Sequence, residues 1–505
     1  MFDRASGVLL HVSSLPGDYG IGGFGEATRR FIDTLHEAGC SYWQVLPFGP
    51  TDQWNSPYSG YSAFAGNPYF IDLETLYEEG LLTSVELEAE RCDNPYTAQF
   101  EKLAKTRRET LKKAFARAGK AELDRVRAYA QAREDWLPDY ALFMALGHVL
   151  KEPDWRKWPL PLRHFEKKAC EEAAEQYADE VLFEEFMQYK FAEQWAGVHA
   201  YAADSGVEII GDMPMYVSLN SADVWSHPDL FDISEDGEPK NVAGVPPDYF
   251  SEDGQKWGNP LYRWDRMKAE GYRWWIRRLK RSLTLFDVVR IDHFRAFSAY
   301  WAVPAEAETA KEGKWNPGPG MDFFNALFTA FGDRTPKIIA EDLGLIDKAV
   351  VDLRDETGFP GMRVMQFGFI DASDNIHLPH NYERNCVAYT GTHDNNTIFG
   401  WMWEVLPHQR KFALDYCHYT GTGDDWQRGG YDSPSCRALI AALWQSSAAL
   451  AIVPFQDLCG FGKDTRINVP GVAEGNWAYR ITDDNLDALD TRWLHDLNVL
   501  YKRGK

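Results

Sequence analysis

The sequence has 505 residues, with 53 Lys and Arg against 76 Asp and Glu, which gives a formal net charge of −23 at pH 7. This acidic balance argues against a nucleic-acid-binding protein, because phosphate recognition needs a basic surface. With 45% hydrophobic and 14% aromatic residues, the chain is too apolar to be disordered and is expected to bury a large core.

The seven cysteines are scattered, odd in number and never spaced as CxxC, so neither a disulfide framework nor a thiolate zinc site is predicted. No apolar run approaches the roughly 18 residues of a membrane span, and the N-terminus lacks the apolar region of a signal peptide. We therefore expect a cytoplasmic protein that acts without a membrane, a metal or a cofactor.

Eight short runs rich in β-branched and aromatic residues recur along the chain, and each ends in a charged or hydroxyl-bearing cluster. They cover residues 7–12, 42–47, 208–217, 288–294, 337–344, 363–369, 386–394 and 450–457. Helical periodicity occurs between several of them, at 25–38, 266–283, 322–331 and 435–446. Eight alternating units predict a (β/α)8 TIM barrel of the α/β class, formed by residues 1–505 as a single catalytic domain. An open doubly wound sheet is less favoured, because no GxGxxG turn follows the first strand.

A long segment, about residues 76–199, separates the second and third predicted strands and is dominated by Ala, Glu, Lys, Arg and Leu. Its part from 100 to 150 has the pattern of two or three amphipathic helices, and the charge run at 171–185 is typical of a solvated helix face. A loop of this length inside a barrel has to fold by itself. We therefore predict a mainly helical insertion at the C-terminal face of the barrel.

A second insertion, residues 218–262, follows the third predicted strand. Its part from 243 to 260 reads AGVPPDYFSEDGQKWGNP, and the paired prolines and the glycines predict a shaped loop without regular structure. The loop carries Tyr249, Phe250 and Trp257 near its tip. Aromatic residues beside a predicted active face favour a lid, while an ordinary connecting loop is the alternative.

Catalytic groups of a barrel project from the carboxyl ends of its strands. Charged clusters stand at four such ends: Gly211-Asp212, residues 290–293, residues 340–342 and residues 391–394. A single carboxylate there is most simply a structural ion pair, whereas several that converge on one barrel mouth predict acid/base chemistry.

Two carboxylates without a metal-ligand motif indicate cleavage of a glycosidic bond. Hydrolysis at a metal held by Asp292, His293, His393 and Asp394 is the rival interpretation, which the absence of HxH or HExxH spacing disfavours. The 19 Trp, 24 Tyr and 29 Phe also fit a saccharide ligand, because the CH faces of sugars rest on aromatic rings. Tyr58 stands out, because it lies in the turn-rich run SPYSGY.

Long ordered motifs give the chain a resemblance to a known family, the 4-α-glucanotransferases of glycoside hydrolase family 77, also called amylomaltases or disproportionating enzymes. The resemblance extends from Gly7 to the C-terminal segment NWAYRI and is weakest in the helical insertion. It is carried by LLHVSSLPGDYGIG, YWQVLPFGPT, SPYSGYSAFAGNPY, GDMPMYV, GVPPDYFSEDGQKWGNPLY, VVRIDHFRAF, IIAEDLG and GTHDNNT.

The resemblance implies a retaining mechanism with three carboxylates. Asp292 in RIDHF would be the nucleophile, Glu341 in AEDLG the general acid and then base, and Asp394 in THDNN the group that stabilises the transition state. Arg290 would keep the nucleophile ionised and oriented. The other residues implied to bind substrate are Ser56, Tyr58, Asp212, Tyr249, Phe250, Trp257, Asn259 and His393.

The implied activity is transfer of α-1,4-glucan segments from a donor to the 4-OH of an acceptor glucan or glucose, through a covalent glucosyl-Asp intermediate. This disproportionation would act on maltooligosaccharides, and it leaves cycloamylose formation open. An α-glucan hydrolase and an inactive glucan-binding scaffold are the alternatives. A monomer or weak homodimer is expected. Trp54 stands where some relatives carry a Tyr of a second glucan site, so it either replaces that stacking surface or the second site is missing.

Overall fold

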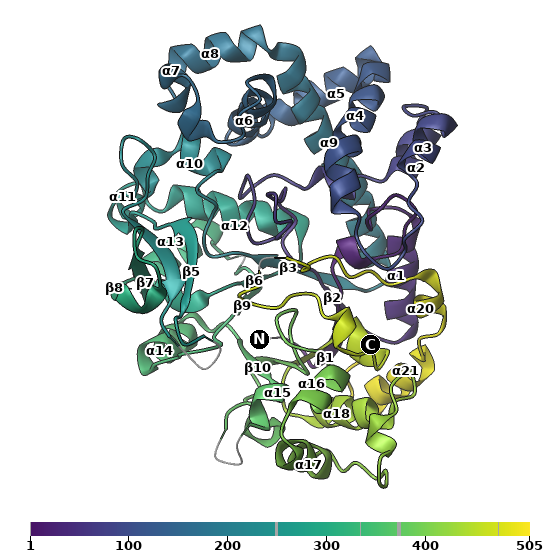
Figure 1. The fold of residues 1–505 in the computed structure, drawn as a ribbon. Helices are drawn as coiled ribbons and strands as arrows, with labels where there is room; N and C mark the ends of the chain where they lie inside the picture. Colours follow the sequence, from purple (N-terminus) through teal and green to yellow (C-terminus); the bar gives the residue numbers. More distant parts are fainter. Residues whose placement is uncertain (1, 248–250, 334, 371–374, 473, 505) are drawn as a thin grey trace.

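The computed structural model describes residues 2–247, 251–333, 335–370, 375–472 and 474–504. Its centre is a parallel sheet of eight strands that curls into a barrel with helices around it (Figure 1). The strands are β1 (Ala5–Leu9), β2 (Tyr42–Gln44), β3 (Glu208–Met213), β6 (Val288–Ile291), β9 (Ile338–Ala340), β10 (Gly361–Val364), β11 (Cys386–Tyr389) and β12 (Leu450–Pro454). Each overlaps one of the eight predicted runs, so the predicted (β/α)8 barrel is confirmed.

The order of the barrel strands is β10-β11-β12-β1-β2-β3-β6-β9. The two end strands meet where the Ala340 N–H donates a hydrogen bond to the Pro360 carbonyl, at 2.9 Å. A buried cluster with residues from every strand fills the interior, among them Leu9, Tyr42, Ile210, Val288, Ile339, Met362, Val387 and Ile452. Because the interior is packed, functional side chains have to project from the ends of the strands.

The helices that follow the barrel strands lie on its outside, and all four predicted helical segments are found. The segment 266–283 is divided in two, because Gly271 and Tyr272 adopt left-handed backbone angles, with φ of 67° and 54°. These outer helices are α1 (Glu26–Glu37), α11 (Trp264–Ala269), α12 (Arg273–Leu285), α13 (Met321–Phe331), α14 (Lys348–Thr357), α15 (Met365–Gly368), α16 (Ile398–Glu404), α17 (Pro407–Tyr416), α18 (Pro434–Gln445), α19 (Phe455–Leu458), α20 (Asp483–Asp487) and α21 (Thr491–Leu500).

Eight α-helices lie between β2 and β3, and in Figure 1 most of them gather at one end of the molecule. They are α2 (Leu73–Glu78), α3 (Ser84–Glu90), α4 (Phe100–Arg117), α5 (Lys120–Gln131), α6 (Leu137–Val149), α7 (Leu160–Arg163), α8 (Lys167–Gln176) and α9 (Ala178–Asp204). The prediction of a solvated face for residues 171–185 is wrong at Glu184, which is 1% exposed and pairs with Arg108 on α4 at 2.5 Å. Among the described helices, none is long and apolar enough to cross a membrane.

The prediction that residues 243–260 lack regular structure is wrong. β4 (Asn241–Val245) and β5 (Gln255–Pro260) form an antiparallel hairpin, which β7 (Ala299–Pro304) and β8 (Lys314–Pro317) extend to a second sheet of order β5-β4-β7-β8. Pro246 and Gly254 lie between β4 and β5, so these turn residues interrupt no strand. The short helix α10 (Ala222–Ser226) precedes this sheet.

Candidate active site

One buried arginine joins two carboxylates at the floor of the barrel mouth. Asp212 at the end of β3 is the cross-strand neighbour of Arg290 on β6. Arg290 Nη1 lies 2.7 Å from both carboxylate oxygens of Asp212, and its Nη2 lies 3.0 Å from Oδ1 of Asp292. The side chains of Arg290 and Asp212 are 4% and 0% exposed, whereas that of Asp292 is 29% exposed. Of the two carboxylates, Asp292 is therefore the one that a ligand can reach.

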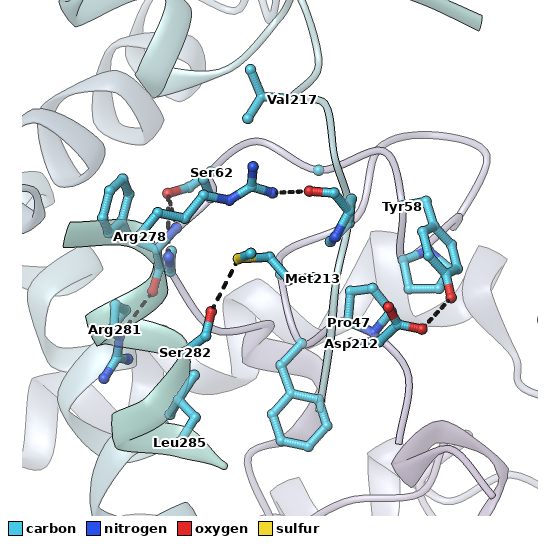
Figure 2. A pocket seen from close by; sticks show the side chains of 18 of the residues that line it. Pro47, Tyr58, Ser62, Asp212, Met213, Val217, Arg278, Arg281, Ser282 and Leu285 are labelled. Atoms are coloured by element: carbon cyan, nitrogen blue, oxygen red, sulfur yellow. Dashed lines mark hydrogen bonds between the residues drawn. The ribbon is translucent and has the colours of Figure 1, made fainter. Parts of the chain in front are cut away.

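Tyr58 connects this ion pair to His393. Its hydroxyl donates to Asp212 Oδ2 at 2.8 Å, as Figure 2 shows, and lies 2.9 Å from His393 Nε2. The two rings stack with their centroids 5.2 Å apart and their planes 16° apart. Burial and the neighbouring Asp212 raise the pKa of the Tyr58 hydroxyl, which stays a hydrogen-bond donor at neutral pH. The turn after β2 thus reaches over the floor of the mouth.

Glu341 follows β9 and is held by main-chain groups. Its Oε2 accepts from the His293 N–H and its Oε1 from the Leu343 N–H, both at 2.7 Å. Burial and the Asp292 charge raise the pKa of Glu341 to about 8, against the opposing influence of Arg290 and the two N–H donors. Glu341 is therefore protonated at neutral pH, as a general acid has to be.

Asp394 follows β11 on the far side of His393. Its Oδ2 lies 3.4 Å from His393 Nε2, and its side chain is 45% exposed. The Asn468 amide donates to Asp394 Oδ1 at 2.6 Å, and the Arg466 guanidinium donates to the main-chain carbonyl of Asp394. An accessible carboxylate with a fixed orientation is suited to bind sugar hydroxyls.

Three residues of the site were missed in the sequence: Arg466, Asn468 and Trp477. The Trp477 ring lies 5.7 Å from that of Tyr58 and 6.1 Å from that of His393. The one available signal was the segment NWAYRI, which contains Trp477 and belongs to the family resemblance. No spacing pattern could join Asn468 to Asp394, because 74 residues separate them along the chain.

The other predicted binding residues differ in how far their side chains are available to a ligand. Trp257 on β5 is 38% exposed, and its ring meets that of His293 edge to face, with centroids 5.0 Å apart. The Asn259 amide donates to the Val217 carbonyl at 2.9 Å, and Ser56 Oγ accepts from the Tyr58 N–H at 3.3 Å. The last two side chains thus shape the surrounding loops. Tyr249 and Phe250 lie outside the described residues, and all these substrate contacts stay predictions.

A cavity of about 60 Å³ lies behind Tyr58 and Asp212, between the turn after β2, the end of β3 and α12 (Figure 2). Ser62, Met213, Arg278 and Ser282 are among its lining residues. This volume is too small for a glucosyl unit and fits a few water molecules. A sugar therefore has to approach from the exposed side of Asp292 and Asp394.

The rival metal interpretation finds no geometric support in the described parts of the chain. Asp292, His293, His393 and Asp394 do not bring three ligand atoms within 4.8 Å of one another, and the acidic group that does is Glu79, Glu122 and Glu193 in the helical insertion. There the Lys190 ammonium contacts all three carboxylates, at 2.8 Å from Glu79 and 2.9 Å from Glu193, and offsets one of their three charges.

Comparisons with known proteins identify the family of the chain. The family model described as 4-alpha-glucanotransferase matches residues 10–486. A 4-alpha-glucanotransferase of Thermus thermophilus is 46% identical over 96% of each chain, and one of a Synechocystis strain is 44% identical over 99% of this chain and 98% of its own. The solved amylomaltase of Streptococcus agalactiae, in complex with acarbose, superposes with a TM-score of 0.94 at 36% identity, over 99% of this chain and 100% of its own.

Proposed function

Because this chain belongs to the 4-alpha-glucanotransferase family, and is therefore a glycosyl-transferring enzyme, we propose that it moves α-1,4-glucan segments by a retaining mechanism with Asp292 as nucleophile and Glu341 as acid and base. The acarbose bound by the amylomaltase relative supports an α-glucan as the substrate class. Maltooligosaccharides are the donors, and a second glucan chain or glucose is the acceptor.

The charge balance at the barrel mouth carries this proposal. Three carboxyl groups, those of Asp212, Asp292 and Glu341, share one arginine. Arg290 contacts the first two, and the proton is held by Glu341, the carboxyl group whose pKa is raised to about 8. A nucleophile paired with an arginine thus stands near an acid that is protonated at neutral pH, and retaining glycosyl transfer starts from such a pair.

In the first half-reaction, Glu341 gives its proton to the glycosidic oxygen while an Asp292 carboxylate oxygen attacks the anomeric carbon. The C–O bond to the leaving chain breaks, and a β-glucosyl ester of Asp292 forms. In the second half, the Glu341 carboxylate takes the proton from the 4-OH of the acceptor as that oxygen attacks the anomeric carbon, and the bond from this carbon to the Asp292 oxygen breaks. Two inversions return the α-linkage and restore both carboxyl groups.

Asp394, His393 and Tyr58 surround the sugar ring in this proposal. The Asp394 carboxylate accepts hydrogen bonds from sugar hydroxyls, and these bonds strengthen as the ring flattens in the transition state. Asn468 and Arg466 hold Asp394 in place for this task. The face of Tyr58 offers a stacking surface while its hydroxyl remains bound to Asp212.

Transfer dominates over hydrolysis where an acceptor sugar is held close and water is excluded. We assign this role to the hairpin of β4 and β5, whose exposed Trp257 lies against the residue next to the nucleophile. When the free end of a long donor chain serves as its own acceptor, the product is a cyclic glucan. Chromatography of products from maltotriose separates the cases: a transferase forms chains longer than maltotriose, and a hydrolase forms shorter ones alone.

The covalent step is tested by trapping the intermediate. An α-glucosyl fluoride needs no acid to leave, so Glu341→Gln should accumulate the ester because the base of the second step is missing. Mass spectrometry of the digested variant is expected to find a glucosyl unit on the peptide that contains Asp292. The matched variant Asp292→Ala should carry none. A glucosyl unit on another peptide, or none on any, would refute Asp292 as the nucleophile.

A further inference from the structure

His293 stands between the two proposed catalytic carboxyl groups. It directly follows Asp292 at the end of β6, and its backbone is left-handed, with φ 50° and ψ 47°. Residues with a Cβ atom rarely adopt this conformation; His, Asn and Asp tolerate it better than others, and β-branched residues tolerate it least. A strained backbone next to a nucleophile suggests a functional constraint.

The left-handed turn directs the His293 main chain at Glu341. The His293 N–H donates to Glu341 Oε2 at 2.7 Å, and the next N–H, that of Phe294, donates to the Glu341 carbonyl at 3.1 Å. A main-chain donor favours the charged form of a carboxyl group. It therefore opposes the burial and the Asp292 charge that raise the pKa of Glu341, in the same direction as Arg290 and the Leu343 N–H.

The imidazole ring of His293 acts by packing. It meets Trp257 edge to face at 5.0 Å and lies 6.3 Å from the Tyr216 ring. Its Nε2 is buried and has no hydrogen-bond partner among the described residues. Burial lowers the pKa of His293 to about 4, so the ring is neutral where Glu341 titrates. Its influence on Glu341 therefore comes through the backbone and not through a charge.

We propose that His293 is a positioning residue for Glu341: its left-handed backbone aims a main-chain N–H at the acid/base carboxyl. The inference rests on the proposed role of Glu341.

The test compares two substitutions that differ in their tolerance of the left-handed region. His293→Val disfavours it and should withdraw the N–H, whereas His293→Gly adopts it freely. For kcat/KM on maltotriose, measured by glucose release, the parent should lose activity as pH rises through about 8, where Glu341 loses its proton. His293→Val should move this alkaline limb of the pH profile up by about one pH unit, which is the effect of one lost hydrogen bond to a charged group. It should also lower kcat at least tenfold with little change in KM. His293→Gly should leave the limb in place.

His418 provides a matched control. It is also left-handed, with φ 53°, but it is exposed and follows α17, away from the mouth. His418→Val should reproduce the local backbone cost without moving the limb. If His293→Val does not fold, as judged by thermal unfolding, His293→Ala makes the same comparison with a smaller backbone penalty.

Two outcomes would overturn the role of His293: a folded Val or Ala variant that keeps the parent limb, or a Gly variant that moves it as far as Val does. Glu341→Gln separates this failure from failure of the proposed function. If the limb survives in Glu341→Gln, Glu341 is not the titrating acid and the proposed function is wrong. If the limb disappears there and His293→Val still matches the parent, the inference about His293 alone fails.

Discussion

Two adjacent residues after β9, Glu341 and Asp342, have carboxyl groups with different kinds of partner. Glu341 faces the β6 side, and its hydrogen-bond donors among the described residues are the main-chain N–H groups of His293 and Leu343. Asp342 faces the β10 side and is 5% exposed. Its carboxylate accepts from Arg354 at 2.6 Å, from the Met362 N–H at 2.6 Å and from Arg363 at 3.4 Å. One step along the chain thus separates a carboxyl group with no ion-pair contact among the described residues from one that contacts two arginines.

The difference shows how a barrel divides catalysis from stability. Around Asp342, two arginines offset the charge of one buried carboxylate. Around Arg290, one arginine serves Asp212 and Asp292 while Glu341 stands beside them, so negative charge is in excess. A proton on Glu341 removes that excess, and this is the proton that general acid catalysis consumes.

The division between a catalytic and a stabilising network is tested most strongly by removing one carboxylate from each network. Asp292→Asn should lower kcat for disproportionation by on the order of 10⁴-fold or more, because the nucleophile is lost while the shape of the site is kept. Asp342→Asn is the matched control: it should lower the melting temperature and keep kcat within about tenfold of the parent. Initial rates of glucose release from maltotriose and thermal unfolding measure both. A folded Asp292→Asn that keeps a tenth of the parent kcat would contradict the assignment.

Removing the cation from each network tests the same division. Arg354→Met and Arg290→Met each leave a buried carboxylate poorly compensated, so each should lower the free energy of unfolding by about 3 to 5 kcal/mol. Arg290→Met should in addition raise the pKa of Glu341 and abolish most of the transfer activity. Arg354→Met should keep the pH profile of the parent. Urea unfolding and the pH dependence of kcat/KM are the measurements, and equal pH profiles for the two variants would refute the division.

The sequence predicted the barrel because its strands are continuous apolar runs between helical segments, which is the pattern of a parallel sheet covered on the outside. It predicted the second sheet wrongly, because Pro246 and Gly254 were interpreted as signs of a loop although they lie between two strands. The charged clusters at the strand ends were visible in the sequence. Their division into two networks was not, because it depends on which neighbouring strand each side chain faces.

Tertiary structure also decides the contacts that tune the site. The pairing of Asp212 with Arg290 follows from the register of β3 against β6. The support of Asp394 comes from Asn468, 74 residues away. The motif RIDHF does not predict the left-handed backbone of His293, because histidine tolerates this conformation but does not require it.

The last test of the comparison concerns stability against pH, and it addresses the proton that Glu341 holds. The pKa of Glu341 is raised to about 8 in the folded state, whereas the carboxyl group of an unfolded chain titrates near 4.3. Between these values the folded state binds the extra proton, so Glu341 makes the free energy of unfolding fall as pH rises, by at most about 1.4 kcal/mol per pH unit. Glu341→Gln lacks this proton. The parent should therefore lose stability relative to Glu341→Gln from about pH 5 to about 8, and the difference should level off above. Urea unfolding of both proteins at several pH values measures it, and a difference that stays constant would show that Glu341 is ionised throughout.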